Sequence, residues 1–370
     1  MLASIIICTY NRSDLLKDSI TSIQNQCFPM DQFEIVVVDN NSFDNTRQIF
    51  DQLARVSPVP IKYVFEERQG LSYARNSGIE YSVGEIVVFT DDDVIAEKTW
   101  LREMLSVFDN HDVACVGGPI RPIWPFEKPS WLNADWLIEP LSVSEFNSAK
   151  DKSYFTGHYP FGANIAFRRD SFNQFGVFSL DLGRQAGRLL SNEEIELCQR
   201  IEAAGKLIGF APNAIIYHKI APERLTKQWF YRRFYWQGRS DAVLDANLGR
   251  DVYGRLRQCV TSILTSYFVD GHVDFYQKCK NRMSKGYLHQ RIIQADTGEK
   301  GNTYRPIRAF EKLLNTMSAT STSTHNLADE ALKEKIRLLE EQVAGLQASN
   351  SWRITAPLRA IHKWIMNISK

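Results

Sequence analysis

The N-terminal part of the chain alternates short apolar runs with amphipathic segments of helical period, such as residues 71–81. The apolar runs are rich in Ile, Val and Phe, which favours β-strands. They lie at Ser4–Cys8, Glu34–Val38, Ile61–Phe65 and Glu85–Phe89. Strands that alternate with helices of about a dozen residues are typical of an α/β protein with a central, mostly parallel sheet flanked by helices on both faces. We therefore expect this fold class.

Local signals extend this prediction along the chain. Ser13 is expected to be the N-cap of the helix that follows the first strand. Farther along, segments rich in Pro, Trp and Gly, such as 119–140 and 157–164, are expected to be loops and irregular strands around a pocket. A helical period returns at 191–204, and a mainly helical extension is expected over 226–295.

Polar residues follow three of the predicted strands, at the point where each strand ends. They are Thr9–Arg12, Asp39–Ser42 and Asp91–Asp93. Because the carboxyl ends of parallel strands share one edge of a sheet, where ligands of such folds bind, we expect these segments to lie together. Three consecutive acids repel one another and lose hydration when they pack against a core. A positive charge is therefore expected beside Asp91–Asp93.

Composition narrows the class of protein. Lys+Arg 44 and Asp+Glu 43 leave a net charge of +1, so the overall charge does not indicate a nucleic-acid partner. The 6 Cys are scattered without a C-x-x-C pair, which argues against a zinc site or a disulfide framework and fits a reducing compartment. We find no signal peptide, and no apolar stretch approaches the roughly 18 residues of a membrane span. A cytoplasmic protein is expected.

The composition changes again towards the C-terminus. Residues 315–326 are rich in Ser and Thr and are expected to form a flexible linker. Farther on, apolar spacings of four and three predict a short coiled coil through Leu332, Ile336, Leu339, Val343 and Leu346. Trp352–Lys370 is basic and amphipathic, so we expect it to contact the inner face of a membrane peripherally, or to dock on this chain or a second copy. The expected divisions are 1–225, 226–314, 315–326 and 327–370.

Six motifs then carry a resemblance to a known family. In chain order they read "CTYNR", "VVVDNNSFDNT", "GLSYARNSGI", "VVFTDDDV", "GANIAFRRD" and "NEEIELCQRI". Together they resemble the successive motifs of family-two glycosyltransferases with the GT-A fold, over roughly residues 3 to 240. The resemblance implies transfer of a sugar from a nucleotide-diphosphate donor to a glycan or lipid-linked acceptor, usually with inversion and with a divalent metal ion. It places the catalytic domain in 1–225.

The resemblance also implies roles for particular residues on the donor side. Donor contacts are expected from Thr9, Tyr10, Asn11, Arg12, Asp39, Arg75, Asp91 and Asp92. Tyr10 resembles a stacking surface for uracil, which favours a UDP-sugar. Asp91, Asp93 and His218 are expected to bind Mg²⁺ or Mn²⁺, which would neutralise the charge of the leaving diphosphate. Alternate residues of an extended segment point to the same side, so Asp91 and Asp93 are expected to face the ligand together.

The acceptor side is expected to be formed by a second group of residues. An inverting transfer needs a base for the acceptor hydroxyl proton. The family's Glu-Asp pair is Glu193-Glu194 here, and Glu194 is the expected base. Glu193 and Glu196 are expected to orient it or to contact the acceptor, and Gly162 and Asn164 resemble the acceptor-side turn.

Each of these residues has a structural alternative. Asp91–Asp93 could form a solvated acidic turn, Asp39–Ser42 a turn with a helix cap, and Glu193 with Glu194 an acidic first turn stabilised by the helix dipole. Arg75 could be a solvated helix residue, and His218 a structural histidine.

Other functions also stay open at this stage. A sugar-1-phosphate nucleotidyltransferase shares the α/β layout, but it would normally carry a glycine-rich basic loop after the first strand, and "CTYNR" has no glycine. A non-catalytic nucleotide-sugar-binding scaffold is the third alternative. Residues 229–239, which mix arginines with aromatics, fit a lid over the diphosphate or a helix on a membrane or partner.

Overall fold

The computed structural model describes residues 1–144, 158–185, 187–250, 254–256, 258–259, 262–263 and 274–297. The chain divides into two compact units, Met1–Arg233 and Phe234–Lys370. The predicted linker at 315–326 and the coiled coil and tail of 327–370 lie outside the described residues.

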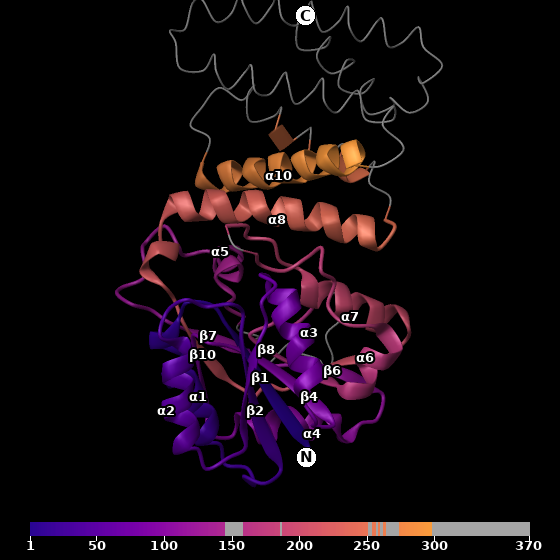
Figure 1. Ribbon diagram of the computed structural model, residues 1–370. Helices are drawn as coiled ribbons and strands as arrows, with labels where there is room; N and C mark the ends of the chain where they lie inside the picture. Colours follow the sequence, from indigo (N-terminus) through magenta and orange to yellow (C-terminus); the bar gives the residue numbers. More distant parts are fainter. Residues whose placement is uncertain are drawn as a thin grey trace, which may run out of the picture. The chain divides into compact units, whose positions relative to one another are not determined.

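The first unit is built on a seven-stranded sheet with the strand order β3-β2-β1-β4-β8-β6-β9 (Figure 1). Its strands are β1 (Ala3–Thr9), β2 (Phe33–Asp39), β3 (Ile61–Phe65), β4 (Ile86–Asp91), β6 (Val113–Gly117), β8 (Asn164–Arg168) and β9 (Leu207–Phe210). β8 runs antiparallel to both of its neighbours, β4 and β6, while the other pairs are parallel. The mostly parallel sheet and the four predicted strands are thus confirmed.

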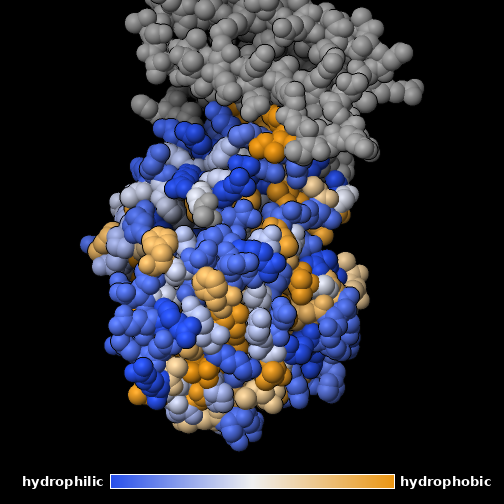
Figure 2. All heavy atoms as spheres, in the orientation of Figure 1, coloured by the Kyte–Doolittle hydropathy of each residue, from blue (hydrophilic) through white to orange (hydrophobic). Residues whose placement is uncertain are grey.

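Helices cover both faces of this sheet (Figure 1). One face carries α1 (Ser13–Gln24), α2 (Thr46–Arg55) and α4 (Trp100–Ser106), and the other carries α3 (Leu71–Tyr81), α6 (Arg169–Phe175) and α7 (Glu193–Ala203). Alternate strand residues serve the two cores: Ile5 and Ile7 of β1 join the first, and Ile6 joins the second. The face of the first unit in Figure 2 is correspondingly hydrophilic, with only small separate apolar groups.

A smaller sheet completes the first unit. It contains β5 (Val94–Ala96), β7 (Ile120–Ile123) and β10 (Ile216–Lys219) in the order β5-β10-β7. Short helical turns accompany it: η1 (Val107–Asp109), α5 (Asp135–Ile138), η2 (Glu139–Leu141) and η3 (Pro222–Arg224). The described parts of 119–140 and 157–164 are mostly irregular, as predicted. β10 brings residues that are distant in sequence up to the turn that follows β4, because its His218 pairs with Val94.

The predicted cap of the first helix was wrong. Ser13 is the first residue of α1, and Arg12 stands at the cap position without a side-chain hydrogen bond. The backbone N–H of Ser13 instead donates to Asp44 Oδ2 at 3.0 Å. A carboxylate from the loop before α2 therefore caps α1 in place of the expected hydroxyl. The spacing of residues in the sequence does not reveal such a partner.

The second unit contains the remaining part of α8 (Lys227–Asn247) and α10 (Phe275–Thr297), so the expected helical extension is confirmed over its described residues. The two helices touch backbone to backbone: a Cβ at Gly238 would lie 1.8 Å from Met283 O, and one at Gly286 would lie 1.8 Å from Tyr235 O. Only glycine permits this approach. None of the helices in the described ranges is long and apolar enough to cross a membrane.

Candidate active site

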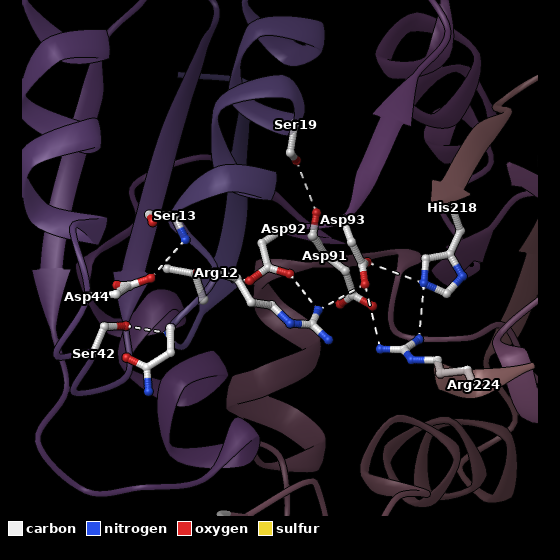
Figure 3. A network of polar contacts seen from close by, with 12 residues as sticks. Arg12, Ser13, Ser19, Ser42, Asp44, Asp91, Asp92, Asp93, His218 and Arg224 are labelled. Atoms are coloured by element: carbon white, nitrogen blue, oxygen red, sulfur yellow. Dashed lines mark hydrogen bonds and ion pairs between the residues drawn. The ribbon is translucent and has the colours of Figure 1, made fainter. Parts of the chain in front are cut away.

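The acidic triplet lies at the carboxyl edge of the main sheet and is compensated by an arginine. β4 ends at Asp91, and Asp92 and Asp93 follow in a turn where both are buried. Arg12 Nη1 lies 2.9 Å from Asp92 Oδ1 and 2.9 Å from Asp93 Oδ2 (Figure 3). The solvated-turn alternative is therefore wrong, and part of the expected positive charge comes from the chain itself.

The two buried acids differ in how strongly they hold a proton. Burial raises the pKa of Asp92 to about 6, although Arg12 and the hydroxyl of Thr9, which donates to Asp92 Oδ2 at 2.7 Å, favour the ionised form. Burial also acts on Asp93, but the contact with His218 and the charges of Arg12 and Arg224 outweigh it and lower its pKa below the usual range. Asp93 is therefore the stronger acid of the two.

The expected alternation of the triplet differs from the structure. Neighbouring acids, Asp92 and Asp93, share Arg12, whereas the side chain of Asp91 is partly exposed and lies 3.9 Å from Arg75 Nη2. The reason is local, since the extended backbone ends at Asp91 and the next two residues turn. A period of two applies only within a strand.

His218, on β10, lies between a carboxylate and an arginine (Figure 3). Its Nε2 is 3.3 Å from Asp93 Oδ1 and 3.4 Å from Arg224 Nη1. A protonated Nε2 can donate to Asp93 but repels Arg224, and an unprotonated Nε2 accepts from Arg224 but faces Asp93 with a lone pair. The protein alone therefore satisfies only one of these two contacts at a time.

This arrangement fits a divalent cation in part. Asp93 Oδ1 is buried without a hydrogen-bond partner among the described residues, and an unprotonated Nε2 beside it is a second suitable ligand. Asp91, the third expected ligand, instead lies 3.9 Å from Arg75 Nη2. Within the described residues no three His, Cys, Asp or Glu side chains form a group that could hold a metal ion. Two protein ligands are present, and the others would have to come from substrate or water.

The loop after β1 is locked to the loop after β2. Asn11 adopts a positive φ of 52°, its N–H donates to Ser42 Oγ at 2.9 Å, and its Oδ1 accepts from the N–H of Phe43 at 2.9 Å. The two loops joined by these hydrogen bonds expose two aromatic rings to solvent. Tyr10 is 38% exposed and Phe43 is 84% exposed, with their centroids 6.3 Å apart in an edge-to-face arrangement. Sequence reasoning missed Phe43, although an aromatic inside the polar "NNSFDN" run is a visible signal.

Asp39 is engaged inside the protein. Its Oδ1 accepts from the N–H of Ser42 at 2.8 Å, and its Oδ2 accepts from the hydroxyl of Tyr63 at 2.6 Å. The turn alternative therefore has direct structural support, and the donor contact of Asp39 stays a prediction.

Arg75 forms a buried bridge between the donor and acceptor sides, so its solvated alternative is wrong. Its Nη1 lies 2.5 Å from Glu193 Oε1, and its Nη2 faces Asp91. A Cβ at Gly162 would lie 2.1 Å from Arg75 Nη2, so this glycine makes room for the arginine, and its contact with the acceptor stays a prediction. Burial, together with the charge of Glu194, outweighs Arg75 and raises the pKa of Glu193 to about 7.

Glu194 is the second residue of α7, and one of its carboxylate oxygens is free. Its Oε1 accepts from the N–H of Gly162 at 3.2 Å, while its Oε2 is buried and has no hydrogen-bond partner in the described part of the chain. Both glutamates are buried in the first turn of α7, so the alternative of an acidic turn stabilised by the helix dipole has direct structural support, and the role of Glu194 as base stays a prediction. Glu196 pairs with Arg200 at 2.8 Å and does not orient Glu194.

Asn164 has a structural role rather than the expected place at the acceptor. It is fully buried, and its Nδ2 donates to Pro119 O at 2.9 Å and to Ala214 O at 2.8 Å. Its Oδ1 accepts from Trp100 Nε1 at 2.8 Å. These bonds use both of its donors and tie three distant segments together.

The site thus combines acids, a histidine and arginines at the carboxyl edge of the sheet with a buried glutamate. Residues 4–176 match the family model of glycosyl transferase family 2, so this part of the chain belongs to that family.

Three proteins illustrate what the chain is similar to. The chain is 27% identical over 253 residues to the glucosyl-dolichyl phosphate glucuronosyltransferase of Haloferax volcanii, which covers 66% of this chain and 78% of the relative. It is 26% identical over 240 residues to the succinoglycan biosynthesis protein ExoM of Rhizobium meliloti, covering 64% and 73%. Among solved structures, it is similar to the mannosyltransferase PcManGT from Pyrobaculum calidifontis in complex with GDP-Man and Mn²⁺, at 21% identity and a TM-score of 0.49, covering 99% of this chain and 86% of that one.

Proposed function

We propose that this glycosyltransferase moves a sugar from a nucleotide-diphosphate donor to a glycan or lipid-linked acceptor, with inversion and with help from a divalent cation. The observation that carries the proposal is the bridge made by Arg75. It contacts Asp91, on the expected donor side, and Glu193, whose neighbour Glu194 is the expected base. One buried cation thereby fixes the spacing between the donor carboxylates and the base.

The donor half of the proposal rests on the loops after β1 and β2. Tyr10 and Phe43 expose two flat apolar faces beside Asp39, which suits stacking of a nucleobase. A UDP-sugar remains our preferred donor. Asp93 and His218 would hold Mg²⁺ or Mn²⁺, which when bound supplies positive charge to the leaving diphosphate.

The transfer step is assigned to Glu194. Its free Oε2 takes the proton of the acceptor hydroxyl while the hydroxyl oxygen bonds to the anomeric carbon of the sugar. The bond from that carbon to the diphosphate breaks, and the nucleoside diphosphate leaves with the electron pair. Attack from the face opposite the leaving group inverts the anomeric centre. Glu193 and Arg75 act as positioning residues, since each is held by the other.

The acceptor class is supported by the names of the relatives. One is named for a glucosyl-dolichyl phosphate, which is a lipid-linked sugar, and another for succinoglycan biosynthesis. We therefore propose a glycan or lipid-linked acceptor for this chain. The family assignment sets aside the nucleotidyltransferase and scaffold alternatives.

The proposal is tested with a panel of UDP- and GDP-sugars. Release of nucleoside diphosphate is measured with Mg²⁺, with Mn²⁺ and with excess chelator, for the wild type and for Asp93→Asn. We expect one donor to be hydrolysed in a metal-dependent way, and Asp93→Asn to lower turnover by about two orders of magnitude.

The matched control for this experiment is Asp112→Asn, which changes an acid whose side chain is 74% exposed and pairs with Lys206. This variant should keep wild-type turnover. Full activity of Asp93→Asn in chelator would refute the metal-dependent mechanism, and absence of any nucleotide-sugar turnover would refute the donor class.

A further inference from the structure

Arg224 is a buried cation whose charge the surrounding protein leaves incompletely neutralised. It ends η3, just after β10, and its side chain is only 9% exposed. The nearest carboxylate oxygen in the described residues is Asp93 Oδ2, at 3.7 Å, which is too long for a hydrogen bond. Its other polar neighbour is His218 Nε2 at 3.4 Å. Figure 3 shows the guanidinium pointing towards both residues.

The carboxylate that faces Arg224 is already occupied. Asp93 Oδ2 receives Arg12 Nη1 at 2.9 Å, so the better-placed arginine takes the shared oxygen. Arg184 and Arg12 are close enough to Arg224 to add repulsion to the effect of its burial. A buried charge without a hydrogen-bonded counter-charge is unfavourable in general. Such an arrangement is expected where an anionic ligand completes it.

The position of this cation indicates which anion. Arg224 contacts Asp93 and His218, the two residues proposed to hold the divalent cation, and it lies on the Arg12 side of the triplet rather than on the Arg75 side. The Arg75 side leads to Glu193 and the proposed base. The unneutralised charge is therefore on the side of the leaving group, and a guanidinium matches the oxygens of a phosphate in geometry and charge.

We infer that Arg224 binds the diphosphate of the donor directly and stabilises its negative charge as the sugar leaves. This inference rests on the proposed function and adds a leaving-group contact supplied by the protein itself. The contact does not depend on the metal ion.

The inference has a consequence for stability that a structural ion pair would not have. Replacing Arg224 by Gln removes the poorly compensated charge but leaves Asp93 paired with Arg12 at 2.9 Å. The Tm of Arg224→Gln should therefore equal or exceed that of the wild type. A cation that held the fold together would leave a buried unpaired acid when removed, and the Tm would fall.

The experiment measures binding by calorimetry, with the full chain and without turnover. UDP and GDP are titrated into the wild type and Arg224→Gln, once with Mg²⁺ and once with excess chelator. We expect the variant to lose about tenfold or more in affinity for whichever diphosphate binds the wild type, in both conditions. The control is Arg68→Gln, an arginine at the end of β3 that is paired with Glu66 at 2.8 Å, which should leave affinity unchanged.

The outcomes separate the inference from the proposed function. If the wild type binds neither UDP nor GDP, the proposed donor class is wrong. If the wild type binds and Arg224→Gln binds equally well, or if the variant unfolds, the inference is wrong and the proposed function stands. A third titration, with decyl phosphate, addresses the phosphate of a lipid-linked acceptor. Weaker binding of decyl phosphate with undiminished binding of the diphosphate would assign Arg224 to the acceptor and overturn the inference.

Discussion

The acidic residues of the site are of two kinds, which differ in whether both carboxylate oxygens are hydrogen-bonded. Both oxygens of Asp92 are hydrogen-bonded, to Arg12 and to Thr9, whereas Glu194 keeps one buried oxygen without a hydrogen-bond partner among the described residues. Buried polar atoms are almost always hydrogen-bonded, and the exceptions in a cleft of charged residues suggest function. An acid that is fully paired serves to hold charge. An acid with a free oxygen is available to accept a proton.

Glu194→Gln tests this distinction. The amide keeps the size of the side chain but cannot take the acceptor proton, so sugar transfer should fall by roughly two to four orders of magnitude. Nucleotide affinity should stay nearly unchanged, because the residues proposed to hold the donor belong to other elements. Transfer rates and nucleotide dissociation constants measure the two effects separately.

Two neighbouring glutamates provide the controls for that test. Glu196→Gln should lose little activity, since Glu196 is paired with Arg200 on its own helix. Glu193→Gln should lose less than Glu194→Gln, since Glu193 is bound by Arg75. A nearly wild-type Glu194→Gln together with an inactive Glu193→Gln would show that the base is Glu193.

The sequence predicts the residues at strand ends better than their partners. The gathering of Thr9–Arg12 and Asp91–Asp93 at one sheet edge follows from the alternation of strands and helices, which is a local pattern. The burial of Arg75, the structural bonds of Asn164 and the incomplete neutralisation of Arg224 each depend on segments far away in the chain. No local pattern encodes those distances, so these features appear only in the folded protein.

At the scale of elements, the site depends on a junction of four of them. Arg75 comes from α3, Asp91 from the end of β4, Glu193 from the start of α7, and Gly162 from the turn before β8. The bridge closes only because Gly162 has no side chain, since a Cβ there would lie 2.1 Å from Arg75 Nη2. A small residue in a loop thus sets the separation of two helices and a strand.

Gly162→Ala is expected to disturb this junction. The methyl group forces the guanidinium to move, and overpacking of this kind costs about 1–3 kcal/mol of the free energy of unfolding. Urea unfolding measures the loss. Gly254→Ala is the control, because no atom of the described residues lies within 4 Å of a Cβ at Gly254 and alanine there should be neutral or stabilising.

A double-mutant cycle identifies the cause of that loss. In a chain carrying Arg75→Met and Glu193→Gln, which removes the cation and its counter-charge together, Gly162→Ala should cost markedly less. An equal cost in both backgrounds would mean that the clash with Arg75 is not the reason.

Element types were predictable where a strong period exists, and less so elsewhere. The third helix was predicted at the residues where α3 lies, 71–81, because its apolar face has the period of a helix. The antiparallel strand β8 and the small sheet of β5, β7 and β10 were not predicted. Their strands have between three and five residues, too few for a period to be recognised, and their pairing comes from tertiary contact.

At the scale of the whole molecule, the buried acids make stability depend on pH. The folded protein raises the pKa of Glu193 from 4.5 to about 7 and that of Asp92 from 3.8 to about 6, so it binds protons that the unfolded chain has released. It lowers the pKa of Glu66 to about 2, chiefly through its hydrogen bond with Arg68. Acids with a raised pKa and acids with a lowered pKa change the free energy of unfolding in different pH ranges.

The sign follows from proton counting. Between pH 4.5 and about 7 the folded state holds more protons at Glu193 than the unfolded state, so the free energy of unfolding falls as the pH rises. The contribution of Glu66 is present above its unfolded pKa and is lost only as the pH falls towards 2. Without ligand, the protein should thus be less stable at pH 8 than at pH 5, because the partly compensated acids must then ionise inside it.

Glu193→Gln separates this effect from the rest of the molecule. The variant lacks the group that binds the extra proton, so its Tm should change less between pH 5 and pH 8 than that of the wild type, whatever the absolute loss from leaving Arg75 without its partner. Thermal unfolding in excess chelator at both pH values gives the two slopes. Glu196→Gln, whose acid is paired with Arg200, should keep the wild-type slope. Parallel slopes for Glu193→Gln and the wild type would mean that Glu193 is ionised throughout, with Arg75 outweighing both its burial and the charge of Glu194.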